Sequence, residues 1–189
     1  MPKTYLLLLL TSALVLGGVS CNSNDGEDTA SGVVSLYASN SGPAAPPAPA
    51  AGSLTSVVVT FSSLSLYNTL GQAVALATDT NVDIDLLASF SDANSLVGTF
   101  QVPAGDYNGV AGRIQLISVT DGDTGFTCSA GGSISIPRIT LSQPFLTVRD
   151  DGTAAFLVEL PVTGGSCNIQ GGQGTITLGT PSVIALPLS

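Results

Sequence analysis

Apolar and polar residues alternate over short stretches from residue 54 onward. The clearest apolar series is Val57, Val59, Phe61, Leu64 and Leu66. A period of two residues is typical of a strand with one buried face, and the phase slip at Ser62-Ser63 indicates a β-bulge. A second series within residues 82–87 is Val82, Ile84 and Leu86. Both patterns predict half-buried strands.

Similar strand-like runs recur along the rest of the chain, at 33–39, 72–78, 100–102, 114–117, 133–137, 139–148, 154–160, 175–178 and 183–186. Gly and Asp pairs at 121–123, 150–152, 164–165 and 171–172 are typical turn sequences. Only residues 86–94 favour a helical turn. Short, evenly spaced strands indicate a sandwich or a barrel. We expect an all-β chain folded as an antiparallel β-sandwich.

The first 21 residues follow a different plan. Lys3 precedes an apolar run over residues 6–16, and small residues then lead to Cys21. A cation, an apolar segment and a small-residue cleavage site together are typical of a signal peptide, here residues 1–20. The apolar run is shorter than the roughly 20 residues that a spanning helix needs.

Two polar or proline-rich stretches define the remaining boundaries. Residues 21–32 contain no large apolar side chain, so we expect a flexible tether there. The range 33–189 is then the sandwich domain. Residues 41–52 carry four prolines, which predicts an extended Pro/Ala-rich loop within that domain.

The sequence Gly18-Val19-Ser20-Cys21 resembles a bacterial lipoprotein signal. In that family the cysteine after the cleavage point receives diacylglycerol on sulfur. The chain departs from the family at Gly18, where a larger aliphatic residue is usual, so a secreted soluble product is the alternative. Asn22 in the following position implies an outer-membrane location, on either its periplasmic or its surface face. The membrane partner is then the lipid on Cys21.

The cysteine count fits an acylated Cys21. The chain has three cysteines, and an odd thiol in an exported protein needs an explanation. With lipid on Cys21, Cys128 and Cys167 remain to form a disulfide in an oxidising compartment. A loop of this length corresponds to about 4 kcal/mol of chain-entropy stabilisation.

The segment from Pro103 to Tyr107 has the chemistry of a tight turn before a strand. Pro103 fixes φ and Gly105 accepts positive φ. The phenol of Tyr107 is then placed to bond back to the corner, as in the tyrosine corner of immunoglobulin-like sandwiches. The alternative is an ordinary hairpin with an exposed tyrosine.

Three segments in this order carry a second resemblance: 82–87 (VDIDLL), 102–107 (VPAGDY) and 112–116 (GRIQL). They resemble the bacterial lipoprotein family called domain of unknown function 4382. Residues 38–41 and the Pro/Ala run replace the Thr-Asp-Ala-Pro sequence that the family usually has after its first strand. The resemblance implies an exported immunoglobulin/transthyretin-like sandwich without an assigned activity, and it supplies no catalytic residues.

Composition excludes several functions. Charged residues are 9% of the chain, against roughly 25% in average globular proteins. Without Lys3, only Arg113, Arg138 and Arg149 oppose thirteen acidic residues, which argues against nucleic-acid binding. Histidine is absent, so Ser–His–Asp and Cys–His catalysis are impossible. The acids Asp83 and Asp85 share one strand face, although such acids are usually solvated. We therefore expect no enzyme.

Calcium is the one cofactor with candidate ligands. These are the loop acids Asp121, Asp123, Asp150 and Asp151, because oxygen ligands on loops are what Ca²⁺ uses. Ordinary turn chemistry explains the same residues, so no cofactor is the first expectation.

The sequence thus predicts an exported, lipid-anchored, non-enzymatic binding or structural module. Its possible protein partner would add a strand to a sheet edge. The alternative function is a calcium- or carbohydrate-dependent adhesion domain.

Overall fold

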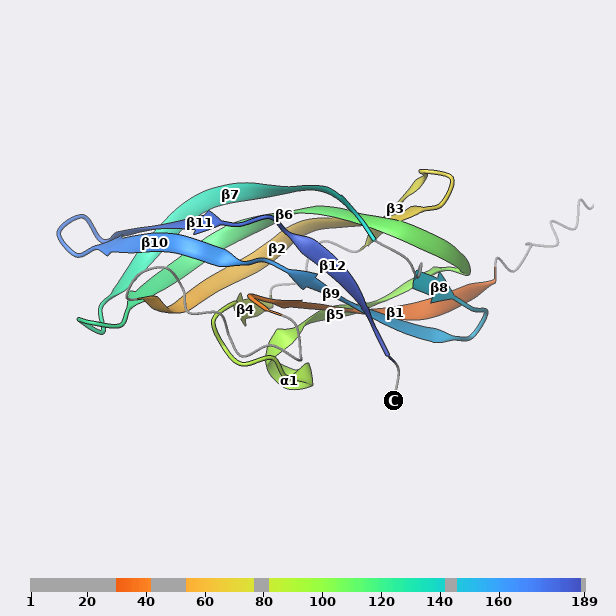
Figure 1. Ribbon diagram of the computed structural model, residues 1–189, viewed down its shortest axis with the longest axis horizontal. Helices are drawn as coiled ribbons and strands as arrows, with labels where there is room; N and C mark the ends of the chain where they lie inside the picture. Colours follow the sequence, from red (N-terminus) through yellow and green to blue (C-terminus); the bar gives the residue numbers. More distant parts are fainter. Residues whose placement is uncertain (1–29, 42–53, 77–81, 142–145, 188–189) are drawn as a thin grey trace, which may run out of the picture.

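The alternating run after residue 53 forms β2 (Leu54–Asn68). Its five predicted inward residues are at most 3% exposed, and its pairing with β6 shifts register between Phe61 and Ser63, where the bulge was expected. This confirms the clearest sequence prediction. The computed structural model describes residues 30–41, 54–76, 82–141 and 146–187, and most of them belong to two packed β-sheets (Figure 1).

The smaller sheet has four strands in the order β12-β9-β1-β5. Their bounds are β1 Ser31–Ser39, β5 Leu96–Pro103, β9 Thr153–Glu159 and β12 Ser182–Leu186. β5 and β12 pair antiparallel with their neighbours, but β1 pairs with β9 in parallel. The expected all-β sandwich is confirmed, and this sheet adds one parallel strand pair to its antiparallel pairs.

The larger sheet has eight strands, six of them in the order β10-β11-β7-β6-β2-β3. The bounds are β3 Ala73–Leu76, β6 Gly105–Asp121, β7 Thr127–Thr140, β10 Val162–Asn168 and β11 Gln173–Leu178. β4 (Asp83–Asp85) also pairs with β2, and β8 (Leu146–Val148) with β6. The central strands β2, β6 and β7 pair antiparallel over most of their length.

The core lies between the two sheets and is formed mainly by Val, Leu, Ile and Phe side chains. A buried asparagine joins the end of β1 to other elements. Asn40 donates its backbone N–H to the Leu86 carbonyl at 3.0 Å, and its side-chain oxygen accepts the Val162 N–H at 2.6 Å. These bonds satisfy backbone groups that would be costly to bury without partners.

Several boundaries differ from the sequence prediction. β1 begins at Ser31, so the last two residues of the expected tether belong to a strand. The helical turn expected over 86–94 is the one-turn helix α1 (Asp92–Ser95), and Ser91 caps it. Val82 is 41% exposed and does not share the buried face of Ile84. Residues 1–29, with the signal peptide and Cys21, and residues 42–52 of the Pro/Ala loop lie outside the described residues.

One turn prediction and one strand prediction were wrong. Gly164 and Gly165 lie inside β10. A Cβ at Gly165 would lie 2.6 Å from the Leu54 side chain, so this glycine permits close approach and does not form a turn. The expected strand 139–148 is not continuous, because β7 ends at Thr140 and β8 begins at Leu146.

Candidate functional site

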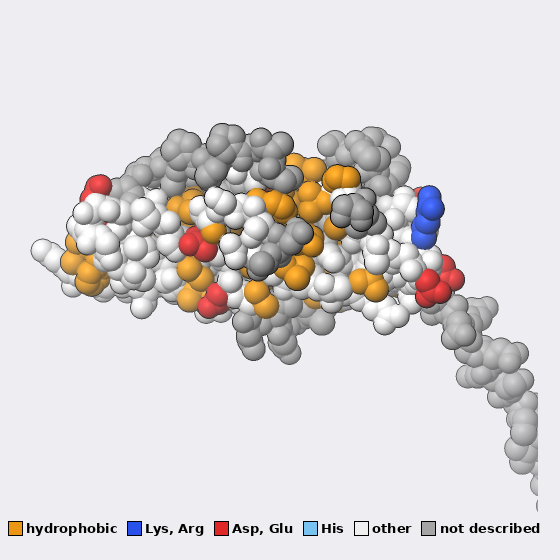
Figure 2. Space-filling view, turned by 90° about the horizontal axis from the view of Figure 1, so that it is seen from below, with side chains coloured by type: hydrophobic (Ala, Val, Ile, Leu, Met, Phe, Trp, Pro, Cys, Tyr) orange, Lys and Arg blue, Asp and Glu red, His pale blue; other side chains and the backbone are white. Residues whose placement is uncertain are grey.

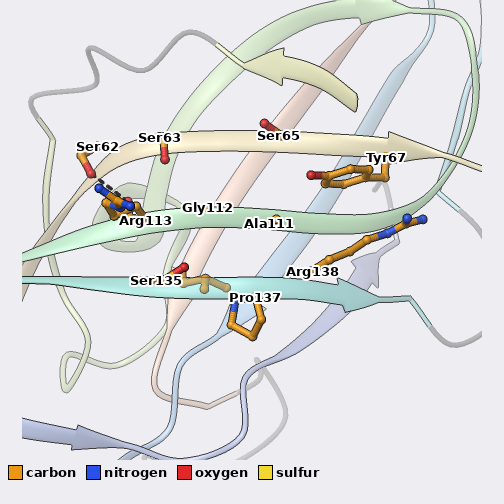
Figure 3. A pocket seen from close by; sticks show the side chains of 11 residues that line it. Ser62, Ser63, Ser65, Tyr67, Ala111, Gly112, Arg113, Ser135, Pro137 and Arg138 are labelled. Atoms are coloured by element: carbon orange, nitrogen blue, oxygen red, sulfur yellow. Dashed lines mark hydrogen bonds between the residues drawn. The ribbon is translucent and has the colours of Figure 1, made fainter. Parts of the chain in front are cut away.

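A groove of about 640 Å³ lies on the outer face of the larger sheet, across β2, β6 and β7 (Figure 3). β2 contributes one wall, β6 the floor and β7 the other wall. Its lining residues are Ser62, Ser63, Ser65, Tyr67, Ala111, Gly112, Arg113, Ser135, Ile136, Pro137 and Arg138. We call it the outer-face groove.

Small residues in the middle strand hollow the surface. Ala111 pairs with Ser65 of β2, and Gly112 lies between Leu64 and Ile136. A Cβ at Gly112 would lie 2.6 Å from the backbone oxygen of Ser63, so the two strands approach closely there. Gly112 is in register with two buried residues and faces the core, so the small outward residue that keeps the groove floor low is Ala111.

Arg138 lies across β6 at one end of the groove. Its guanidinium carbon is 4.5 Å from the centre of the Tyr67 ring, a cation–π contact. It also donates to the side-chain oxygen of Asn108 at 3.2 Å. A Cβ at Gly109 would lie 3.0 Å from Arg138 Nε, so glycine leaves room for the guanidinium to reach the ring. The arginine is thereby held in one orientation.

Arg113 lies toward the other end. It is paired with Ser63 on one side and with Ser135 on the other, so the three residues form one row across the sheet. Ser62 Oγ donates to the backbone carbonyl of Arg113 at 3.2 Å (Figure 3). The Arg113 side chain is exposed.

The charge of the groove is opposite to that of the protein. The whole chain has a formal charge of −9, yet the groove residues include two arginines and no carboxylate. On the opposite side of the sandwich, which Figure 2 shows from below, the visible basic side chains occur only at one end. The outer-face groove therefore offers guanidinium and hydroxyl groups to an anionic, hydrogen-bonding ligand.

The structure joins Cys128 and Cys167 in a disulfide, as the cysteine count suggested. The bond links β7 to β10 and passes over β11, where Gly174 lies opposite Cys167. A Cβ at Gly174 would lie 3.4 Å from Cys128 Cβ. Glycine at this position thus leaves space for the bridge.

Tyr107 adopts the corner arrangement and not the exposed one. The side chain is 2% exposed, and its hydroxyl donates to the carbonyl of Pro103 at 2.7 Å. Gly105 between them has φ +157, within the range that favours glycine. Burial raises the pKa of the Tyr107 phenol above 10.0 because the charged form loses hydration.

The two pairs of calcium candidates are not brought together. Asp121 ends β6, whereas Asp150 lies beyond Val148, which pairs with Gly105 at the other end of that strand. A strand of 17 residues is on the order of 50 Å long. Within the described ranges, no group of three or more His, Cys, Asp or Glu side chains could hold a metal ion.

The carboxylates of these pairs make local hydrogen bonds. Asp121 Oδ1 accepts from the N–H of Asp123 at 3.1 Å and from the N–H of Thr124 at 2.9 Å. Asp150 Oδ1 accepts from the N–H of Ser31 at 3.2 Å, and Asp151 has φ 51 in the adjoining turn. These are contacts typical of turn aspartates.

Asp83 and Asp85 are likewise bound to neighbouring strands. Asp85 Oδ1 accepts the N–H groups of Val57 and Leu87, each at 3.0 Å. Asp83 Oδ1 accepts the hydroxyl of Thr60 at 2.5 Å. Both carboxylates help to hold β4 against β2.

Sequence reasoning did not identify the outer-face groove. In the sequence, Arg113 and Arg138 stood out only as two of the few basic residues, and nothing singled out Tyr67. A signal was nevertheless present: glycine and alanine at 109, 111 and 112 are poor strand formers, and such residues often mark a close approach.

Comparison with known proteins gave no match to any family model, any curated protein or any solved structure. Among the described residues, no helix is both long enough and apolar enough to cross a membrane.

Proposed function

We propose that this chain is an exported, lipid-anchored protein of the bacterial cell envelope, whose β-sandwich is a non-enzymatic binding or structural module. The observation that carries the proposal is the disulfide between Cys128 and Cys167. Because the chain has three cysteines, Cys21 is the one left for acylation. It directly follows the leader with its apolar run, which is where lipoproteins carry their lipid.

The resemblance to the domain of unknown function 4382 family agrees with this proposal, since that family consists of exported lipoproteins with a sandwich domain. Acyl chains contribute about 0.8 kcal/mol per buried CH₂, so two or three chains hold a protein firmly on a bilayer. In the lipoprotein family that the leader resembles, a residue such as Asn22 after the cysteine goes with release to the outer membrane, which supports an outer-membrane location. Secretion as a soluble product remains the competing outcome of the test.

The binding role is supported by the outer-face groove. Its side chains stand on three paired strands, and a site on such a scaffold needs little reorganisation to bind. The carbohydrate form of the adhesion alternative is favoured by the hydroxyl-rich lining. Among the residues that the structure describes, no comparable set of ligands supports its calcium form.

Acylation is tested by expressing the full chain in a diderm bacterium fed a clickable palmitate analogue. We expect label on the wild-type protein and on Cys128→Ala, and none on Cys21→Ala. Intact mass of the detergent-extracted protein should show cleavage before Cys21, added acyl chains and two hydrogens fewer than the dithiol form. A released, unlabelled wild-type protein would contradict lipid anchoring.

The binding role is tested by cross-linking in intact cells followed by mass spectrometry. We expect adducts that involve residues of β2, β6 or β7. If no envelope component is recovered, the protein is not a binding module.

A further inference from the structure

We propose that the outer-face groove binds an acidic polysaccharide, with Arg113 and Arg138 hydrogen bonding to carboxylate groups of successive sugars. This rests on the proposed role as a binding module and specifies its ligand class.

The first argument is charge. The net charge of the protein is negative, so the protein as a whole does not attract an anion. Attraction for an anion must come from the two arginines within the groove. The planar guanidinium matches a carboxylate through two parallel hydrogen bonds. Arg138 donates to Asn108 through one nitrogen and lies on the Tyr67 ring, which fixes its plane and leaves further N–H donors. The fixed orientation lowers the entropy cost of binding.

The second argument is the lining between the arginines. Four serine hydroxyls and the Tyr67 phenol line the groove, and its one buried apolar member, Ile136, is 2% exposed. Hydroxyl groups exchange hydrogen bonds with sugar hydroxyls as both donors and acceptors. The groove has no deep apolar pocket in which a peptide side chain could be anchored.

The third argument is position in the sheet. Peptides that bind by strand addition need a free sheet edge. β6 is paired on both sides, with β2 and with β7, so its backbone groups are already used. The floor of the groove therefore recognises its ligand through side chains, which suits a glycan. A peptide that adds a strand would have to pair with the far side of β7, where β11 pairs at Ser129, and not with the groove floor.

Spacing points to a polymer. Arg113 pairs with Ser135, which precedes Arg138 by three residues along β7. Three residues of a strand span about 10 Å. Figure 3 shows the two arginine side chains directed toward opposite ends of the groove. One small anion cannot reach both, whereas a chain with repeated carboxylates can contact each in turn.

The test is calorimetric titration of the detergent-solubilised mature protein with polygalacturonate, with neutral dextran and polyglutamate titrated in parallel. We expect binding of polygalacturonate that weakens as salt is raised, and no binding of dextran. Arg113→Gln and Arg138→Gln should each weaken affinity at least about tenfold, the loss expected for a hydrogen bond to a charged group. Arg149→Gln removes the same charge outside the groove and should leave affinity unchanged.

Three results overturn the inference: no heat with polygalacturonate, equal affinity in the double Arg113→Gln, Arg138→Gln variant, or tighter binding of polyglutamate. Circular dichroism of each variant reports whether it is folded. If Arg138→Gln does not fold, Arg138→Lys keeps the charge without the planar fork and should also bind more weakly. Labelling at Cys21 is independent of these titrations, so an acylated protein that ignores polygalacturonate refutes the ligand and not the lipid anchor.

Discussion

Tyr107 shows how one side chain fixes the start of a long strand. Pro103 ends β5, Gly105 begins β6, and the hydroxyl of Tyr107 bonds back across the corner to the Pro103 carbonyl. The ring fills the core while the hydroxyl satisfies a carbonyl, so both ends of the side chain stabilise the same turn. An intramolecular bond of this kind contributes about 0.5–1.5 kcal/mol.

Tyr107→Phe should lower the free energy of unfolding by about 1 kcal/mol at neutral pH. The folded pKa of the phenol is raised above 10.0 by desolvation. The contribution of this neutral, buried phenol is therefore complete below about pH 10 and is lost as the pH rises through the folded pKa. Urea unfolding at neutral pH and above pH 10 should show the wild type losing stability faster than the variant.

The matched control is Tyr37→Phe. Tyr37 packs against Phe90, with ring centroids 5.9 Å apart, and within the described part of the chain its hydroxyl makes no hydrogen bond. This variant should retain the alkaline loss of stability. Equal curves for Tyr107→Phe and the wild type would show that the corner bond contributes nothing.

At the scale of elements, the hairpin of β10 and β11 depends on the disulfide. The hairpin joins β7 by a single bridge between Gln173 and Ser129, and the Cys128–Cys167 bond lies beside that bridge. Figure 1 shows the hairpin tip extending at one end of the sandwich. Few ladder bonds hold it to the sheet, so the covalent link supplies much of its attachment.

Replacing both cysteines, Cys128→Ala with Cys167→Ala, should lower the free energy of unfolding by up to about 4 kcal/mol. In amide hydrogen exchange, β10 and β11 should lose protection more than β2 or β6 does. Cys21→Ser, which leaves the bridge intact, is the control. Uniform loss across all strands would indicate that the disulfide acts only through the unfolded state.

The elements that could be predicted are those with an unambiguous period. β2 was located together with its bulge, because five large apolar residues alternate with small polar ones. β6 and β7 were recognised only in part, since glycines and alanines interrupt the pattern where the groove floor lies. Pro137 was taken as a strand end, but it occupies a register shift between β6 and β7, a position that tolerates a missing N–H donor.

At the scale of the whole molecule, sheet order depends on pairings between distant segments. β1 pairs in parallel with β9, although more than a hundred residues separate them in the chain. No local pattern specifies such a pair. The groove has the same origin: Tyr67, Arg113 and Arg138 come together only because β2, β6 and β7 are neighbours in one register, so the sequence predicted the sandwich but not its candidate site.

Net charge gives the last prediction, which concerns the molecule as a whole. The chain carries thirteen acidic and four basic residues, and its sequence pI is about 4.1. At neutral pH the acids repel one another and destabilise the compact state. Raising the ionic strength from 0.01 M to 0.15 M shortens the Debye length from about 30 Å to about 8 Å, so the midpoint temperature of thermal unfolding should rise.

Two controls test whether this rise comes from screening of the net charge. NaCl and KCl should act equally, because screening depends on ionic strength alone. Near pH 4 the effect should vanish, since carboxylate protonation removes the repulsion. A midpoint that falls with salt at neutral pH would mean that local attractions, such as those of the arginines, outweigh the net charge.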